Sequence, residues 1–258
     1  MTQLNFTKYQ GTGNDFIMID NRMAVVDPNN HTLIIKLCDR KFGIGADGLI
    51  LIQNHPEYDF EMIYFNADAS QSMCGNGSRC AVHFARQLKL IGNSCRFLAI
   101  DGPHEATIKG DIVKLKMGDV GKVDKIKEDY FVNTGSPHYI RLVDDIHSFP
   151  VFEEGKFIRN SERYKKEGTN VNFVELRQDN EIFVRTYERG VENETLSCGT
   201  GVTACSLAVS LTGYRSPVKV STLGGDLEVS FEKQPDNAFK QVYLSGPAQE
   251  VFQGTVLV

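Results

Sequence analysis

Two cysteines in this chain stand in the same short pattern, Cys-Gly-polar-Gly. The first copy occupies residues 74–77 and the second occupies residues 198–201. A run of small and apolar residues at spacings of three and four follows each copy, which is the period of a helix packed against a core. The repeated pattern therefore predicts a cysteine at the N-terminus of each of two helices.

A cysteine in that position has specific chemistry. The first N–H groups of a helix lack partners within the helix, and together with the helix dipole they favour a negative charge. Such a site stabilises a thiolate and lowers the pKa of the cysteine, while neighbouring glycines let a ligand approach the backbone. A single copy is better explained as a buried cysteine that acts as a small hydrophobe. The repeat instead favours two thiols that flank one small anionic ligand.

A matched pair of thiols suits the inversion of a stereocentre. One group removes a proton from one face and the other delivers a proton to the opposite face, so the two need similar pKa values. Helix N-termini aimed at an α-carboxylate would stabilise the carbanion that develops. We therefore predict that Cys74 and Cys198 are a catalytic acid/base pair.

Other uses of paired cysteines fit less well. A redox dithiol usually has the pattern Cys-x-x-Cys, which this sequence lacks. A cysteine hydrolase needs one nucleophile and a histidine base, so the second copy would have no purpose. A pyridoxal-phosphate racemase needs a Schiff-base lysine, and no lysine adjoins either copy, although this alternative stays open. The spacing of Cys74 and Cys80 matches zinc ligands poorly, so no metal site is predicted.

The bulk composition is that of an ordinary soluble globular protein. The chain has 258 residues, of which 41% are hydrophobic and 24% are charged. The net charge is −5 and no basic run is present, which argues against nucleic acid as a partner. No apolar run is long enough to span a bilayer, and the first residues do not have the pattern of a secretory signal. We expect the six cysteines to be reduced thiols.

The order of predicted elements repeats in the two halves of the chain. Each half reads as strand, loop, helix and then further short strands, with the Cys-Gly helix in the middle. This predicts an α+β fold of two pseudo-symmetric domains, residues 1–118 and 119–246, each a bent, mostly antiparallel sheet or barrel around its own helix. A C-terminal strand at about 247–258 is expected to pack back onto the first domain. The two helix starts would then face each other across the cleft between the domains.

Three further segments carry local signals of their structure. Residues 43–48 match the dinucleotide pattern G-x-G-x-x-G, but a helix-like segment precedes them and a strand follows, which is the wrong order. We interpret them as turns. Further helices are predicted at residues 31–38 and 157–166.

Several motifs together resemble the diaminopimelate epimerase family. They are Gly-Thr-Gly-Asn-Asp-Phe at residues 11–16, Phe-Asn-Ala-Asp-Ala-Ser at 65–70, Cys-Gly-Asn-Gly-Ser-Arg-Cys at 74–80, Tyr-Glu-Arg-Gly at 187–190 and Cys-Gly-Thr-Gly at 198–201. The match runs over nearly the whole chain in the family's order. The resemblance implies a cofactor-independent epimerase that interconverts LL- and meso-diaminopimelate for lysine and cell-wall precursor synthesis in the bacterial cytoplasm. It also implies a homodimer.

The same resemblance implies roles for individual residues. Cys74 and Cys198 become the acid/base pair, and His138 and Glu188 tune the two thiols. The implied substrate contacts are the side chains of Asn14, Asn66, Asn170, Glu188 and Arg189 and the backbone groups of Gly75, Asn76, Gly199 and Thr200. Arg189 is expected to pair with the distal carboxylate through its fork geometry.

The chain departs from the family pattern in three places. Some members have Gln where this chain has Gly48 and Asn where it has Ser136, and residues 191–197 form a longer segment than usual. Two alternative functions remain. One is another amino-acid racemase of the same fold, acting on proline or hydroxyproline. The other is a non-catalytic protein that binds amino acids, which retention of both cysteines argues against.

Overall fold

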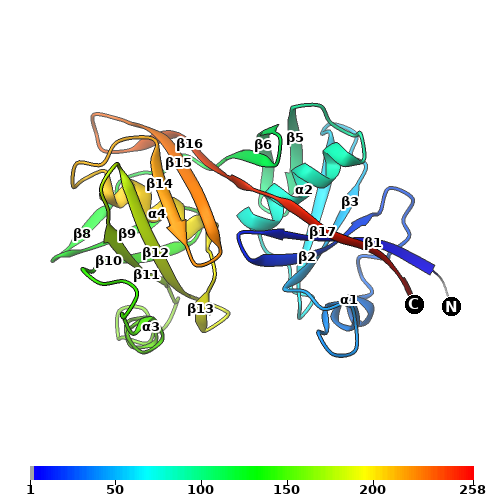
Figure 1. Cartoon of the computed structure of the whole chain (residues 1–258), viewed down its shortest axis with the longest axis horizontal. Coiled ribbons are helices and arrows are strands. Elements are labelled where there is room, and N and C mark those ends of the chain that lie inside the picture. Colours follow the sequence, from blue (N-terminus) through cyan, green and yellow to red (C-terminus); the bar gives the residue numbers. More distant parts are fainter. Residues whose placement is uncertain (1–2) are drawn as a thin grey trace. The chain divides into compact units, whose positions relative to one another are not determined.

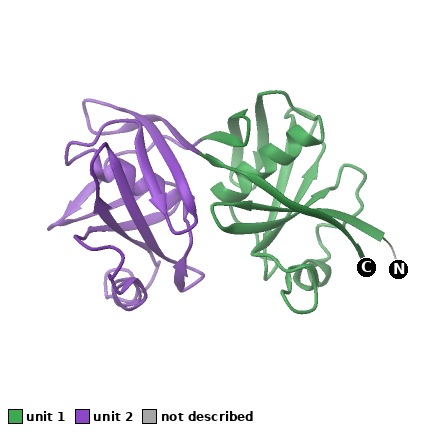
Figure 2. Ribbon diagram, viewed as in Figure 1, with its two compact units in different colours: residues 1–115, 246–258 green, residues 116–245 purple. Residues whose placement is uncertain are grey.

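The computed structural model describes residues 3–258, and these divide into two compact units. Of these described residues, unit 1 comprises 3–115 and 246–258, and unit 2 comprises 116–245 (Figure 2). The C-terminal segment thus returns to the unit in which the chain begins. No helix of the described residues is long and apolar enough to cross a membrane.

Unit 1 is a curved sheet with two helices (Figure 1). Its strands are β1 (Gln3–Gly11), β2 (Asn14–Asp20), β3 (Gly48–Gln53), β4 (Phe60–Asn66), β5 (Ser94–Ala99), β6 (Gly102–Lys109), β7 (Ile112–Lys116) and β17 (Gln249–Leu257). They pair in the order β17-β1-β2-β3-β4-β5-β6-β7, and only the pairs β2–β3 and β4–β5 are parallel. Helix α1 (His31–Cys38) lies in the connection between β2 and β3, and α2 (Gly75–Gln87) lies between β4 and β5.

Unit 2 has the same plan. Its strands are β8 (Asp124–Ile126), β9 (Asp129–Asn133), β10 (Pro137–Leu142), β11 (Asn170–Leu176), β12 (Glu181–Glu188), β13 (Asn193–Thr195), β14 (Val218–Thr222), β15 (Gly225–Lys233) and β16 (Phe239–Pro247). The main order is β8-β9-β10-β11-β12-β14-β15-β16, and β13 pairs with one end of β12. The parallel pairs are β10–β11 and β12–β14, and their connections contain α3 (Val151–Arg159) and α4 (Gly199–Val209).

The two units therefore repeat one sequence of pairings. From β1 to β7 the pairs run antiparallel, parallel, antiparallel, parallel, antiparallel, antiparallel, and the strands from β9 to β16 do the same when β13 is set aside. Parallel neighbours need a long crossover, and in each unit both crossovers carry a helix. The expected α+β class with strongly bent sheets is confirmed.

The second helix of each unit is surrounded by its own sheet. Helix α2 contacts β1, β2, β3, β4 and β6, and α4 contacts β9, β10, β11, β12, β14 and β15. All but one residue of α4 are buried, as its small and apolar composition allows. Both sheets thus hold the start of a Cys-Gly helix in a fixed position.

The local predictions were partly wrong. The helix expected at residues 157–166 is instead α3, Val151–Arg159. Pro150 occupies the N-cap position without a side-chain capping bond, two acidic residues lie in the first turn, and Asn160 ends the helix. Asn160 departs from helical geometry (φ −95°, ψ 5°) and its side-chain Nδ2 donates to the Lys156 carbonyl at 2.8 Å, so the helix ends there and turns follow. The short strand β13 lies within residues 191–197, the segment that is longer than usual in the family. Residues 43–47 form bends and loop, close to the expected turns, but Gly48 already begins β3.

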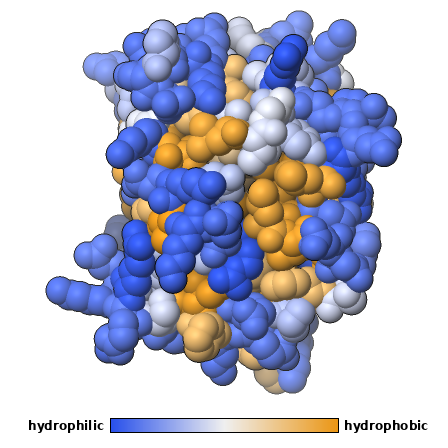
Figure 3. All heavy atoms as spheres, turned by 90° about the vertical axis from the view of Figure 1, so that its left-hand side faces the viewer, coloured by the Kyte–Doolittle hydropathy of each residue, from blue (hydrophilic) through white to orange (hydrophobic). Residues whose placement is uncertain are grey.

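On the face shown in Figure 3, exposed apolar residues form separate patches between polar residues. The most exposed large apolar side chains include Met23 (85%), Phe42 (83%) and Phe157 (75%). Scattered apolar side chains are normal on a folded protein. The surface pattern is therefore no guide to a functional site.

Candidate active site

Cys74 is the N-cap residue of α2, at the position the repeat predicted. Its backbone is extended (φ −134°, ψ 113°), and the Gly77 N–H donates to Cys74 Sγ at 3.4 Å. A donor at the first turn of a helix stabilises negative charge on sulfur. Cys74 is half-buried, so its thiol is held by the helix without being enclosed in the core.

Two asparagines join Cys74 in unit 1. Asn14, the first residue of β2, has its Oδ1 3.5 Å from Cys74 Sγ and 3.5 Å from Asn76 Nδ2. Asn76 is buried in the first turn of α2, and its Oδ1 lies 3.5 Å from the Thr12 hydroxyl. The structure thus brings together three of the residues expected in the site, which we call the Asn14–Cys74–Asn76 group.

Asn66 ends β4 and belongs to the same unit. Its Oδ1 accepts from the Tyr64 hydroxyl at 2.9 Å, and its Nδ2 donates to the Ser70 carbonyl at 3.2 Å. A carbonyl can only accept, so these two bonds fix which end of the amide points where. Asn66 therefore has a lone pair on Oδ1 with which to accept a further hydrogen bond.

Tyr64 also explains the glycine at position 48. A Cβ on Gly48 would lie 2.5 Å from the Tyr64 ring and 2.4 Å from the Phe65 carbonyl oxygen. The ring of Tyr64 fills the space that the Cβ atom of any larger residue at position 48 would need. Sequence reasoning did not identify Tyr64, because an aromatic residue in a strand ordinarily indicates core packing.

Arg79 is a second residue that sequence reasoning did not select, although it lies inside the first motif. It is fully buried, and its guanidinium donates to Thr12 Oγ1 at 3.0 Å and to the carbonyls of Gly75 and Pro247 at 3.4 Å. Among the described residues no carboxylate pairs with it, and burial lowers its pKa. The neighbouring Cys80 is also fully buried, and burial raises the pKa of its thiol to about 12. Cys80 therefore faces the core of unit 1.

Cys198 is the N-cap residue of α4 in unit 2. Its backbone is again extended (φ −120°, ψ 111°), but the first turn makes no side-chain cap bond to it. Instead its Sγ lies 3.5 Å from the hydroxyl of Thr200, and that hydroxyl lies 3.0 Å from His138 Nε2. Thr200 therefore lies between His138 and the Cys198 thiol, so these two residues are linked through its hydroxyl.

The hydrogen-bond pattern fixes the tautomer of His138. Asn172 Nδ2 donates to the Tyr139 carbonyl at 3.0 Å, and the same nitrogen lies 3.2 Å from His138 Nδ1, which must accept. Nε2 then carries the proton and donates to the Thr200 hydroxyl, whose own proton is free to point at Cys198 Sγ. Full burial lowers the pKa of His138 to about 3, so the ring is neutral near pH 7.

The remaining polar residues of unit 2 form a second cluster. Asn170 Nδ2 donates to Ser136 Oγ at 3.0 Å, and Asn170 Oδ1 accepts from the Arg189 N–H at 2.9 Å. The Arg189 guanidinium donates to Ser136 Oγ at 3.3 Å and is exposed at the surface of the unit. Glu188 ends β12 and accepts from the Thr195 hydroxyl of β13 at 2.8 Å. Ser136 thus binds two of the expected substrate contacts.

Each unit places a thiol beside backbone N–H groups at the start of a buried helix. In unit 1 these groups belong to Gly75 and Asn76, and in unit 2 to Gly199 and Thr200. Such N–H groups bind carboxylates and other anions. Within residues 3–258, no cluster of three or more His, Cys, Asp and Glu side chains could hold a metal ion.

Comparison with known proteins gives consistent results. A family model described as diaminopimelate epimerase matches residues 6–123 and 130–251. The diaminopimelate epimerase of Flavobacterium psychrophilum is 51% identical over 254 residues, covering 96% of this chain and 98% of the relative. That of Aquifex aeolicus is 40% identical, with 97% of each chain covered.

Solved structures show a wider likeness in fold alone. A PhzF-family phenazine biosynthesis protein from Bacillus anthracis aligns with a TM-score of 0.79 at 14% identity and covers 100% of both chains. A hydroxyproline epimerase from Agrobacterium vitis aligns with a TM-score of 0.70 at 13% identity and covers 98% of this chain and 92% of its own. Because the family model covers most of the sequence and a relative is 51% identical over nearly all of it, this chain belongs to the diaminopimelate epimerase family.

Proposed function

We propose that the protein interconverts LL- and meso-2,6-diaminopimelate by inverting one α-carbon. The observation that carries the proposal is the placement of Cys74 and Cys198 as N-cap residues of the two equivalent helices of the repeat. The names of the relatives at 51% and 40% identity support the choice of substrate.

In the proposed reaction the two cysteines act as a base and an acid. One thiolate takes the α-proton and becomes a thiol, while the other thiol gives its proton to the opposite face of the α-carbon and becomes a thiolate. The two cysteines exchange protonation states in each turnover, so the reverse reaction uses the same groups in exchanged roles. The reaction needs no oxidant, and we propose that it needs no cofactor.

The polar groups around each thiol suit these roles. Asn14 Oδ1 can accept the proton of the Cys74 thiol, and Gly77 N–H can donate to the thiolate. The Thr200 hydroxyl can donate to the Cys198 thiolate, with His138 behind it. At least one hydrogen-bond donor thus stabilises the thiolate form of each cysteine. A residue that must lose its proton during the reaction needs such a donor.

We further propose that the substrate is held at both ends. The N–H groups of the first turns of α2 and α4 would bind the carboxylate at the reacting carbon. The distal amino-acid group would contact Asn66, Asn170 and Arg189. The Asn66 Nδ2 group already donates to Ser70 and to Ser72 Oγ, whereas Oδ1 can accept one more bond, so we assign Asn66 to the ammonium group. We assign Arg189 to the carboxylate.

The oligomeric state and the cellular compartment of the enzyme are also part of the proposal. We propose that it acts as a homodimer in the cytoplasm, where its product serves lysine and peptidoglycan precursor synthesis. Size-exclusion chromatography with light scattering would test the dimer, and a monomer as the active species would refute it.

The experiment is a conversion assay with matched variants. Purified protein is incubated with LL-diaminopimelate, and the stereoisomers are separated by chiral chromatography. We expect the meso isomer to accumulate to equilibrium, and Cys74→Ala and Cys198→Ala each to lose roughly 10²–10⁴-fold or more, as expected for a proton-transfer group. Lysine lacks the distal carboxylate and should be inert. Comparable racemisation of lysine or proline would refute the assignment to diaminopimelate.

A further inference from the structure

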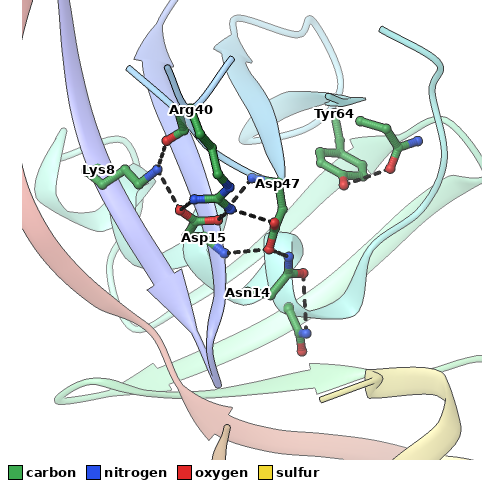
Figure 4. A network of polar contacts seen from close by, with 9 residues as sticks. Lys8, Asn14, Asp15, Arg40, Asp47 and Tyr64 are labelled. Carbon is green, nitrogen blue, oxygen red and sulfur yellow. Dashed lines mark hydrogen bonds and ion pairs between the residues drawn. The ribbon is translucent and has the colours of Figure 1, made fainter. Parts of the chain in front are cut away.

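An ion-pair network at the edge of unit 1 ends on Asn14 (Figure 4). Arg40, just after α1, donates to Asp15 Oδ1 and to Asp47 Oδ1, both at 2.7 Å. Asp47, just before β3, accepts from Asn14 Nδ2 through its other oxygen at 2.6 Å. Lys8 pairs with Asp15 at 2.8 Å on the buried side of the network.

The network is anchored at Asp15. Burial alone would raise the pKa of Asp15, but the hydrogen bonds from Arg40 and Lys8 outweigh it and lower the pKa to about 2. Asp15 also accepts from the backbone N–H of Asp47 at 3.0 Å, which ties the start of β3 to β2. Asp47 therefore has a defined position even though its side chain is 45% exposed.

Asp47 decides which way the amide of Asn14 points. A carboxylate accepts hydrogen bonds and does not donate them, so the Asn14 NH₂ group must face Asp47. The carbonyl oxygen of Asn14 is then directed at Cys74 Sγ and at Asn76 Nδ2, each 3.5 Å away. In the reversed orientation Asn14 would place an oxygen against the Asp47 carboxylate and an NH₂ group against the NH₂ of Asn76.

We propose that Asp47 is a positioning residue of the active site, which acts through Asn14 to present a hydrogen-bond acceptor to the Cys74 thiol, and that Arg40 holds Asp47 in place for this purpose. The proposal rests on the function proposed above for Cys74. The Asn14 oxygen favours the protonated form of Cys74, and the Gly77 N–H favours its thiolate. These two groups together keep both protonation states of Cys74 accessible.

A simpler reading is that the network only stabilises the fold. Exposed ion pairs contribute little to stability, and Arg40 is 58% exposed. The chain offers a matched control at the other end of β2, where Asp20 pairs with Arg22 at 2.6 Å with both side chains about one-third exposed. Asp20 has no bond to a residue of the Asn14–Cys74–Asn76 group, so Asp20→Ala removes a comparable pair without releasing Asn14.

The experiment measures Cys74 directly and needs no substrate. The rate of alkylation of Cys74 by iodoacetamide is followed by peptide mass spectrometry between pH 6 and 10 in wild type, Asp47→Ala, Asp47→Asn and Asp20→Ala. In Asp47→Ala the Asn14 amide is free to turn its NH₂ toward sulfur and stabilise the thiolate. We expect its alkylation profile to shift to lower pH and the rate at pH 7 to rise several-fold. Asp47→Asn, which can still offer an oxygen to Asn14, should shift less.

The charged and titratable groups that act on Cys74 within unit 1 include the buried Arg79 guanidinium and the Cys80 thiol. Both are the same in all these variants. A shift in Asp20→Ala as large as that in Asp47→Ala, or no shift in Asp47→Ala, would overturn the proposal.

Kinetics give an independent arm. We expect Asp47→Ala to lower kcat for diaminopimelate about 10–100-fold, by analogy with the loss of residues that orient metal ligands, with a smaller change in KM. In an Asn14→Ala background the same substitution should have no further effect, because Asp47 acts through Asn14. Additive losses would refute this. If the wild type fails to epimerise diaminopimelate, the proposed function falls, while the alkylation profiles still decide the role of Asp47.

Discussion

The second glycine of the two Cys-Gly motifs should respond very differently to substitution by alanine. A Cβ on Gly201 would lie 2.5 Å from Asn172 Oδ1, whereas a Cβ on Gly77 would have the Ile50 Cδ1 methyl at 3.0 Å as its nearest contact. Neither backbone is in the left-handed region, so the surroundings alone decide the outcome. The methyl of Ile50 is the tip of a flexible side chain and can move.

Asn172 cannot move in the same way. It is fully buried, accepts from the Thr186 hydroxyl at 2.9 Å, and donates to the Tyr139 carbonyl and to His138. Replacing glycine by alanine in a helix gains at most about 1 kcal/mol. At Gly201 overpacking costs about 1–3 kcal/mol, and disturbed buried hydrogen bonds cost about 1–3 kcal/mol more.

We therefore expect Gly201→Ala to destabilise the protein by about 2–4 kcal/mol and Gly77→Ala to change stability by less than about 1 kcal/mol. In a protein of this size that difference corresponds to melting temperatures about 5–15 °C apart. Differential scanning fluorimetry of the two variants beside wild type measures it. Equal melting temperatures, or a Gly201→Ala variant more stable than Gly77→Ala, would refute the packing argument.

Three further predictions concern single side chains. Tyr64→Phe removes the hydroxyl that donates to Asn66 but keeps the ring. We expect an unchanged fold and a KM about 5-fold higher, because one hydrogen bond of about 1 kcal/mol is lost. An unaltered KM in steady-state assays would contradict this. Cys80→Ala should retain activity of wild-type order because Cys80 is buried in the core, and a folded variant as inactive as Cys74→Ala would show the assignment of the thiols to be wrong. Burial lowers the pKa of His138 to about 3, so below about pH 6.5 the unfolded chain binds a proton that the folded chain does not. The free energy of unfolding therefore decreases as the pH is lowered, by up to about 1.4 kcal/mol per pH unit. In urea titrations between pH 6.5 and 4.5, His138→Gln should lose this part of the pH dependence, and equal slopes in the variant and the wild type would count against it.

The repeat in the sequence was enough to predict the two helix starts and the class of the fold. Each Cys-Gly copy is followed by apolar residues at helical spacing, and both helices begin directly after the cysteine. Local signals of this kind are strong because they depend on neighbouring residues alone. Helix α3 was misplaced because the prediction started at Phe157, although the Pro150 cap and the acidic first turn gave a better N-terminal signal upstream.

The supporting residues of the site could not be predicted in the same way. Asp47, Asn172 and Tyr64 act through side chains that come from other strands and turns, and no spacing in the sequence links Asp47 to Asn14 or Asn172 to His138. The strand β13 likewise exists because it pairs with the end of β12, which a three-residue segment does not reveal by itself. Contacts between segments far apart in the chain can be identified only once the three-dimensional fold is known.

The central claim, that two thiols act from opposite faces of one carbon, is tested most directly by isotope incorporation. LL-diaminopimelate is incubated with the enzyme in heavy water, and at early conversion the α-hydrogen of substrate and product is analysed by NMR and mass spectrometry. The account predicts product with deuterium at the inverted carbon and remaining substrate that still carries protium, because the thiol that delivers the hydrogen has exchanged with solvent. Product that retains the original protium at that carbon would show that a single group moves the proton, and it would contradict the pairing of Cys74 with Cys198.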